Sequence, residues 1–321
     1  MHNPIFSIVI LNWNGEALIE ECIRSVINTS YKHIEIIVVD NASTDASVDI
    51  IKKYKNVFLI QNDTNVGYAA GNNIGFKYAT GNYIVTLNND VIVDSLWLDH
   101  PLKVFKENSD VGIISCRQMQ YYQKEKIDGL YHIIHADLSV TGFGMDQLYD
   151  SLNITHSNPG FVLSANGGSG IYRKEVVDQI GGFDENFFAY LEEVDLCFQA
   201  FFGGWKCLYS PLSVVFHKGS VSFSKNKSMM YFYRERNRLL FMYKNLPCIL
   251  ILKRIIPIFI WEVRVIRVFF KMGRPSLYFL ARFDAIKKIP YYKEIRKKNI
   301  SLLKKKNKLF KELLKKRIIF D

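Results

Sequence analysis

Short apolar segments alternate with amphipathic segments over the first ninety residues, and this alternation restricts the fold more than any other feature. Each apolar segment is rich in Ile and Val and suits one buried strand, whereas the segments between carry apolar residues at helical spacing. The predicted strands are 5–11, 34–39, 57–60 and 83–87, and the predicted helices are 16–28, 43–54 and 67–78. Strands and helices in this order form a parallel α/β sheet of the kind that binds nucleotides.

Polar residues stand at the carboxyl ends of these predicted strands. Asn12, Asp40 and the run Asn88-Asn89-Asp90 each follow an apolar segment directly. Ligands of open α/β sheets bind there, and a carboxylate beside amides suits a hard cation and the phosphates that it carries. Each motif also has a structural interpretation, because Asn-Asn-Asp is a common turn and Asp40 can cap the following helix.

The turn after the first predicted strand has the sequence NWNG. A dinucleotide-binding enzyme would carry a G-x-G-x-x-G element at this position. The sequence therefore argues against a dehydrogenase.

Two motifs in the second half of the chain suit a ligand site. The glycines of FVLSANGGSGIYR at 161–173 allow close approach of a ligand, or form a tight turn. A helix is predicted to begin near Leu191, with Glu192, Glu193 and Asp195 in its first turn. Acids at that position interact favourably with the helix dipole, and one of them can also act as a general base.

Charge divides the chain into two parts. Residues 1–225 contain 16 Lys and Arg against 25 Asp and Glu, a net charge of −9, whereas residues 226–321 contain 26 against 6, a net charge of +20. The basic part ends in KKNISLLKKKNKLFKELLKKR, whose leucines recur at helical spacing among lysines. This pattern predicts an amphipathic helix with anionic lipid as its partner. We predict no nucleic-acid binding, because the tail contains no recognisable nucleic-acid module.

The cysteines and the lengths of the apolar runs indicate the cellular compartment of the protein. The five cysteines form no C-x-x-C pair and their number is odd, which argues against a disulfide framework and a zinc site. We see no secretion signal and no run of about 18 uninterrupted apolar residues, so we expect a cytoplasmic protein without a conventional spanning helix. Residues 246–270 mix apolar runs with Lys and Arg, which fits either a helix at a membrane interface or a helix packed on the rest of the chain.

Four segments together resemble the family 2 glycosyltransferases, especially their rhamnosyltransferase-like branch. They are SIVILNWNG at 7–15, EIIVVDNASTD at 35–45, NDTNVGYAAGNNIG at 62–75 and YIVTLNNDVIV at 83–93. The resemblance covers roughly residues 5–245 and implies the GT-A fold, a nucleotide-binding, Rossmann-like mixed sheet flanked by helices. We accordingly expect a GT-A catalytic domain at 1–225 and a basic helical region at 226–321 that associates with a membrane.

The resemblance also implies which residues bind the donor. Those that it places at the nucleoside diphosphate are Asn12, Asn14, Asp40, Asn65, Gly67, Asn72, Asn89 and Asp90. The implied cofactor is Mg²⁺ or Mn²⁺, held by Asp90, the one acid of the Asn-Asn-Asp motif, and by His217. Asn166, Gly167 and Gly168 are placed beside the donor sugar and the acceptor.

Two arginines and two histidines have open roles. Arg234 and Arg238 either bind phosphate or belong to a solvated helix face. His132 and His135 are either metal ligands or surface and packing residues.

The family's acidic motif implies a catalytic base. Its usual sequence is Glu-Asp-Val-Asp-Leu, in which the second acid removes the proton, and residues 192–196 read EEVDL. Glu193 is therefore the implied base, with Glu192 as the alternative because the longer side chain leaves the orientation open. One carboxylate base and a metal-held diphosphate suffice for direct in-line displacement, which inverts the anomeric centre.

These implications combine into one expected function. The protein would transfer a sugar from dTDP-rhamnose or a UDP-sugar to a hydroxyl of a lipid-linked glycan, in O-antigen or capsule synthesis, as a peripheral protein on the inner face of the cell membrane. Two alternatives remain open at this point. One is a nucleotidyltransferase, and the other is a non-catalytic sugar-nucleotide-binding assembly protein.

Overall fold

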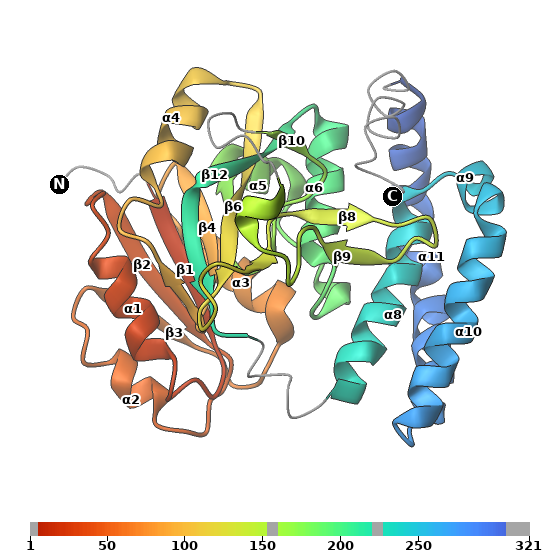
Figure 1. The fold of residues 1–321 in the computed structure, drawn as a ribbon, viewed down its shortest axis with the longest axis horizontal. Coiled ribbons are helices and arrows are strands. Elements are labelled where there is room, and N and C mark those ends of the chain that lie inside the picture. Colours follow the sequence, from red (N-terminus) through yellow and green to blue (C-terminus); the bar gives the residue numbers. More distant parts are fainter. Residues whose placement is uncertain (1–5, 153–159, 220–226, 306–321) are drawn as a thin grey trace.

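The computed structural model describes residues 6–152, 160–219 and 227–305, which form a mixed sheet, flanking helices and a group of C-terminal helices (Figure 1). The strands are β1 Phe6–Asn12, β2 Ile34–Asp40, β3 Val57–Gln61, β4 Tyr83–Asn88, β5 Val91–Val93, β6 Val111–Gln120, β7 Ile127–Gly129, β8 His132–Ile134, β9 Val140–Gly142, β10 Gly160–Val162, β11 Gly170–Arg173 and β12 Lys206–His217. The helices are α1 Ile19–Ile27, α2 Ser47–Ile51, α3 Gly67–Tyr78, α4 Asp99–Glu107, α5 Lys174–Ile180, α6 Glu192–Gly203, α8 Lys227–Asn245, α9 Cys248–Lys253, α10 Ile255–Lys271 and α11 Pro275–Lys305, with 3₁₀ turns η1 Tyr149–Leu152 and η2 Glu185–Phe187.

The sheet confirms the predicted α/β architecture. Its main order is β10-β12-β6-β11-β4-β1-β2-β3, in which β1 to β4 are parallel and β11 is antiparallel to both of its neighbours. The register pairs Asn12 with Asp40 and Leu11 with Asn88, so the polar strand ends meet at one edge of the sheet. This edge is where ligands of such sheets bind.

Apolar side chains cover both faces of the sheet. The buried face of α1, with Ile19, Cys22, Ile23 and Val26, packs on one side of the sheet together with Trp97. Helices α3, α5 and α6 contribute buried side chains to a second apolar cluster. This cluster uses the strand side chains that point to the other face, because successive side chains of a strand point to opposite faces of the sheet.

Helix α2 is shorter than predicted. The sequence predicted a helix at 43–54, but α2 spans Ser47–Ile51. The difference arises because Asp40 accepts from the N–H of Ser43 (2.9 Å) and Asp45 accepts from the N–H of Ser47 (3.0 Å). These side-chain acceptors stabilise a turn where the predicted helix would have begun.

The C-terminal helices pack on the rest of the chain through α6. One apolar cluster joins Phe198 and Phe201 of α6 to Phe241 of α8 and Tyr292 of α11. Helix α11 therefore uses part of its apolar face for protein packing rather than for lipid, and residues 306–321 of the predicted basic helix lie outside the described residues. Of the helices that the structure describes, none is long and apolar enough to cross a membrane. The domain division at 225/226 stays a prediction.

Candidate active site

Three polar side chains at the strand ends form one hydrogen-bond chain. Asn12 donates through Nδ2 to Asp40 Oδ1 (2.8 Å), and its Oδ1 accepts from Asn89 Nδ2 (2.8 Å). All three residues are buried. Asp40 also accepts from the N–H of Ser43, which forms the turn before α2 but does not cap the helix, because α2 begins at Ser47. The structure thus brings three predicted donor-site residues together, with further acceptor capacity on Asp40 Oδ2.

Asn14 joins two of the loops that follow these strands. Its backbone is left-handed (φ 48°), a conformation that Asn tolerates better than most residues. Its Oδ1 accepts from the N–H of Thr44 (2.8 Å), and its own N–H donates to Ser43 Oγ (2.8 Å). Asn14 is exposed, so its side chain lies at the open side of this loop pair.

Backbone amides at the start of α3 form hydrogen bonds within the protein. The carbonyl of Phe188 accepts from the N–H groups of Tyr68 (2.6 Å) and Ala69 (3.1 Å), and Asn65 Oδ1 accepts from the N–H of Gly67 (2.9 Å). Three of the amides that could face an anion are therefore used within the protein. Asn65 and Gly67 shape the entry into α3, where Gly67 has a left-handed backbone (φ 86°) close to the Phe188 ring.

Asn72 lies further along α3 and is fully buried. Its Nδ2 donates to the carbonyl of Tyr68 (2.9 Å), whereas its Oδ1 is buried without a partner among the described residues. The role of Asn72 at the nucleotide stays a prediction.

Asp90 and His217 lie side by side, as the sequence predicted. Strand β5 follows Asp90 and pairs with β12, which ends at His217. The distance from His217 Nε2 to Asp90 Oδ2 is 3.2 Å, and the distance from His217 Nδ1 to Asp128 Oδ2 is 2.9 Å. Burial opposes the charge on His217, but the hydrogen bonds to Asp128 and Asp90 outweigh burial and raise its pKa to about 10. Gln118 Nε2 also donates to Asp128 (2.6 Å).

The donor set of this pair fits a cation that takes most of its ligands from the substrate. Asp90 Oδ1 is buried and has no hydrogen-bond partner in the described part of the chain. The described residues contain no cluster of three or more His, Cys, Asp or Glu side chains that could hold a metal ion. Mg²⁺ is commonly held by one or two carboxylates together with substrate phosphates and water.

The glycine segment after β10 lies between the strand ends and α6. The carbonyl of Gly167 accepts from the hydroxyl of Tyr68 (2.5 Å), and the carbonyl of Gly168 accepts from the N–H of Asn88 (3.2 Å). Asn166 donates through Nδ2 to a carbonyl of β7 (3.0 Å). The predicted sugar-side residues are therefore close to β4 and α3, and their backbone polar groups are partly used in these contacts.

Glu193 lies at the start of α6 and faces this glycine segment. A Cβ atom on Gly167 would lie 3.2 Å from the Glu193 carboxyl carbon, so glycine leaves room for the carboxylate. His132 Nε2 lies 3.4 Å from Glu193 Oε1. The other ring nitrogen, Nδ1, lies 2.9 Å from the carbonyl oxygen of Ala165 and donates to it, because a carbonyl only accepts. His132, an open case at the sequence level, is thus a neighbour of the implied base.

Glu192 precedes Glu193 at the start of α6, and its carboxyl group is buried. Burial, followed by the negative charge of Glu193, raises the pKa of Glu192 well above its usual value. One oxygen of each carboxyl group is buried without a hydrogen-bond partner among the residues described. When two neighbouring carboxyl groups share a buried site, one retains its proton. The arrangement therefore favours the protonated form of Glu192.

Asp195 and His135 have structural roles. Asp195 accepts from Lys244 Nζ (2.6 Å) and Asn245 Nδ2 (2.7 Å), which joins α6 to α8 away from the glycine segment. His135 contacts Thr141 within the β8–β9 hairpin (2.6 Å). The packing interpretation therefore holds for His135.

The two predicted phosphate ligands on α8 lie in different surroundings. Arg238 is buried, is paired with Glu235 and Glu262, and donates to a backbone carbonyl, so its geometry favours a structural role. Arg234 is partly exposed, and we find no ion pair to it within 6–152, 160–219 and 227–305. Burial raises the pKa of the Tyr190 hydroxyl, and the charge of Arg234 opposes that rise, which places Arg234 near the start of α6.

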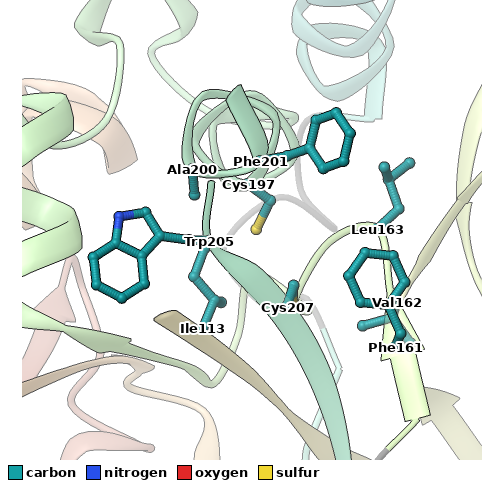
Figure 2. Close-up of a pocket in the computed structure, with 9 residues that line it drawn as sticks. All are labelled: Ile113, Phe161, Val162, Leu163, Cys197, Ala200, Phe201, Trp205 and Cys207. Atoms are coloured by element: carbon teal, nitrogen blue, oxygen red, sulfur yellow. The ribbon is translucent and has the colours of Figure 1, made fainter. Parts of the chain in front are cut away.

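A pocket between α6, β6, β10 and β12 is apolar and unsuited to a nucleotide (Figure 2). Its lining residues are Ile113, Phe161, Val162, Leu163, Cys197, Ala200, Phe201, Trp205 and Cys207. None of these side chains carries a charge. The candidate active site is instead the polar edge that holds Asp90, Gly167 and Glu193.

Comparison with solved structures shows the fold. A mannosyltransferase from Pyrobaculum calidifontis, solved with GDP-Man and Mn²⁺, aligns over 94% of this chain and 85% of its own at 16% identity and a TM-score of 0.59. S. aureus TarS 1–349, solved with UDP-GlcNAc, aligns over 93% of this chain and 89% of its own at 16% identity and a TM-score of 0.58. The predicted GT-A-like fold with its C-terminal helices is thus confirmed.

Comparison of sequences shows the family. An uncharacterised glycosyltransferase of Haemophilus influenzae is 38% identical over 112 residues, which is 34% of this chain and 45% of the relative. This chain therefore matches less than half of that relative's length. The family model "Glycosyl transferase family 2" matches residues 7–181, more than half of the chain. The chain belongs to glycosyl transferase family 2.

Proposed function

We propose that this protein transfers a sugar from a nucleoside-diphosphate donor to an acceptor hydroxyl with inversion, and that Glu193 is the base. The observation that carries the proposal is that Glu193 and Asp90, which have different neighbours, lie on either side of one glycine segment. Glu193 faces Gly167, whereas Asp90 belongs to a cluster that reaches Gly168 through His217, Asp128 and Gln118. A base and an anion-binding group on either side of a sugar are what direct displacement needs.

The base acts in one step. Glu193 accepts the proton of the acceptor hydroxyl while that oxygen bonds to the anomeric carbon and the bond from that carbon to the diphosphate breaks. Neutral Glu192 adds no second negative charge beside Glu193, and His132 Nε2 lies 3.4 Å from Glu193 Oε1. The attack comes from the face opposite the diphosphate, so the anomeric configuration inverts.

Asp90 and His217 would hold Mg²⁺ or Mn²⁺ at the diphosphate. A bound cation neutralises the charge that develops on the leaving diphosphate. Binding through His217 Nε2 requires the ring to lose a proton, because only the neutral imidazole ligates a metal. Arg234 is the second cation near the site that suits a phosphate, and it replaces the predicted pair of Arg234 and Arg238.

The proposed sugar donor is a nucleoside-diphosphate sugar whose nucleotide binds at the polar edge of the sheet. Asn12, Asn14, Asp40 and Asn89 lie at the sheet edge where the base and ribose would bind. dTDP-rhamnose or a UDP-sugar is our specific proposal, and the similar folds solved with GDP-Man and UDP-GlcNAc support a nucleotide-sugar donor.

The experiment that tests the proposal combines binding and product analysis. Thermal unfolding with UDP-, dTDP- and GDP-sugars, each with and without Mn²⁺, should show a Mn²⁺-dependent stabilisation by one class. A ligand that binds only the folded state at a hundredfold excess over Kd stabilises it by about 2.7 kcal/mol. The same donor should then release a nucleoside diphosphate. Release of pyrophosphate would identify a nucleotidyltransferase, and binding without any release would identify a non-catalytic sugar-nucleotide-binding protein.

We further propose that the acceptor is a lipid-linked glycan of O-antigen or capsule synthesis, and that the C-terminal helices hold the protein on the inner membrane face. The exposed apolar residues of these helices include Ile249, Leu252, Ile255, Ile256, Phe259, Phe270, Phe279, Leu280, Phe283 and Ile286. They lie on α9, α10 and α11, beside one another at one end of the molecule (Figure 1). The net charge of +20 in 226–321 complements anionic lipid.

Vesicle flotation tests the membrane proposal. The double variant Ile256→Glu/Phe259→Glu should lose binding to phosphatidylglycerol-containing vesicles by roughly tenfold or more, because each apolar side chain contributes about 1.5–3 kcal/mol when buried. The control is Phe58→Glu/Leu96→Glu, which changes two apolar residues on the catalytic part that are also more than half exposed. Equal flotation of both double variants would contradict the proposal.

A further inference from the structure

The segment that leads into α6 has backbone angles that residues other than glycine rarely adopt. Phe188, Tyr190 and Leu191 all have left-handed φ angles, of 62°, 73° and 70°. None of them is glycine, so each conformation is costly and persists only where the surroundings hold it. Glu192 and Glu193 follow immediately, and the direction in which the first turn of α6 presents them depends on this segment.

One face of α8 holds this segment. Asn237 is fully buried and its Nδ2 donates to the carbonyls of Phe187 (2.8 Å), Ala189 (2.8 Å) and Tyr190 (2.7 Å). Arg236 Nη2 donates to the carbonyls of Asn186 (2.8 Å) and Phe187 (2.7 Å). Arg236 and Asn237 together therefore donate to four carbonyls within residues 186–190. Without these donors, the strained and partly buried loop would leave the four carbonyls unpaired.

Two further contacts fix the segment from both sides. The ring of Phe188 stacks on that of Tyr233 at a centroid distance of 4.8 Å, and Tyr233 lies three and four residues before Arg236 and Asn237 on α8. The carbonyl of Phe188 accepts from the N–H groups at the start of α3. Arg236 also pairs with Asp284 of α11 (3.0 Å), so the support continues into the C-terminal helices.

We propose that Asn237, assisted by Arg236, is a positioning residue that holds Glu193 in place for catalysis. This inference rests on the proposed role of Glu193 as the base. If the carbonyls lose their donors, residues 188–191 relax toward ordinary backbone angles, and the first turn of α6 rotates with them. The Glu193 carboxylate then leaves its place beside Gly167 and His132. A displacement of about 1 Å at a catalytic group costs on the order of a hundredfold in rate.

The test uses the full chain with Asn237→Asp, which keeps the shape of the side chain but removes its donors. The assay is nucleoside-diphosphate release by hydrolysis of UDP-GlcNAc, GDP-Man or dTDP-rhamnose, with water as the acceptor. We expect kcat to fall roughly 10- to 100-fold with donor KM within about twofold. Hydrogen exchange of residues 186–195 should accelerate in the free protein. Arg236→Lys, which keeps the charge opposite Asp284, should cause a smaller loss of the same kind.

Arg173→Met is the matched control for a general loss of stability. Arg173 also donates to three backbone carbonyls, those of Phe105, Asn108 and Val111, but at the opposite end of β4. We compare the loss of kcat with the loss of Tm in both variants. If kcat falls in the same proportion to Tm in Arg173→Met as in Asn237→Asp, the inference is overturned. Unchanged exchange of 186–195 in Asn237→Asp would also overturn it. If Asn237→Asp does not fold, Asn237→Ser and Arg236→Lys are judged by the same two measurements.

The double variant with Glu193→Gln separates this inference from the proposed function. If Asn237 acts through Glu193, Asn237→Asp should cause no further loss of kcat in the Glu193→Gln background. A full additional loss there would overturn the positioning role. Normal turnover of Glu193→Gln alone would instead refute the assignment of the base.

Discussion

The candidate active site contains two pairs of a buried acid and a partly buried histidine, and the second partner of each histidine distinguishes them. His217 lies beside Asp90 and bonds through its other nitrogen to the Asp128 carboxylate (2.9 Å). His132 lies beside Glu193 and bonds through its other nitrogen to the Ala165 carbonyl (2.9 Å). A carboxylate stabilises the imidazolium strongly, whereas a carbonyl fixes the tautomer without adding a charge.

This difference matches the two proposed tasks. The hydrogen bonds to Asp128 and Asp90 outweigh burial and raise the pKa of His217 to about 10. Glu193 has one histidine neighbour and lies beside Glu192, whose pKa is raised by burial and by the negative charge of Glu193. In our proposal the first pair binds the cation and the second pair supplies the base.

The largest expected effect tests the Glu193 pair. Glu193→Gln removes the proton acceptor and should lower kcat by roughly 10²- to 10⁴-fold while donor binding, measured by thermal shift, remains. Glu175→Gln changes an exposed glutamate of α5 and is the control. A loss of less than about threefold in Glu193→Gln would show that this pair does not supply the base.

The second prediction tests the Asp90 pair through pH. Because His217 must lose a proton to ligate Mn²⁺ and its pKa is about 10, the apparent affinity for Mn²⁺ should rise about tenfold per pH unit from pH 7 to 9. Asp128→Asn keeps both proposed ligands but removes the main partner that raises the pKa, so the slope should flatten. Titration calorimetry measures both. A flat profile in the wild-type protein would contradict the proposed ligand role of His217.

The third prediction concerns stability without metal. The pKa of His217 is raised from 6.5 to about 10 in the folded protein, so its stabilising contribution is complete below pH 6.5 and is lost as pH rises toward 10. Urea unfolding in EDTA should therefore show that His217→Gln costs more at pH 6 than at pH 9.5. The difference is at most about 5 kcal/mol, at 1.36 kcal/mol per pKa unit. His135→Gln is the control, and an equal cost at both pH values would refute the charged state of His217.

The smallest expected effect belongs to Glu192. Burial and the charge of Glu193 keep Glu192 protonated, and glutamine resembles a protonated glutamic acid in shape and polarity. Glu192→Gln should therefore change kcat by less than roughly threefold, in the same assay as Glu193→Gln. A loss of kcat comparable to that of Glu193→Gln would show that Glu192 is the base or that both carboxyl groups are needed for catalysis.

Much of the fold and one half of the site were predictable from the sequence. Asn12, Asp40 and Asn89 were placed together because the carboxyl ends of parallel strands share one sheet edge. The placement of His217 beside Asp90 came from the family resemblance, and the β5–β12 pairing bears it out. The carbonyl of Phe188, a residue more than a hundred positions away, accepts from two amides at the start of α3, and no local pattern indicates this contact.

The remaining half depends on contacts between distant segments. Asp128 and His132 lie in a stretch with little periodicity, and pairing of β7 with β6 and of β8 with β9 brings them to the site. Asn237 looked like an ordinary helix residue between two arginines, because its three carbonyl partners lie on a segment about fifty positions earlier. No local pattern marks such a residue.

The sequence by itself determined the alternation of strands and helices, the polar edge of the sheet and the division of charge between 1–225 and 226–321. These features follow from local periodicity and composition. Only the tertiary structure decided the raised pKa of Glu192, the raised pKa of His217 and which helix supports the strained segment before Glu192. The physical reason is that protonation and strain depend on groups within a few ångströms in space, and chain folding rather than sequence proximity selects those neighbours.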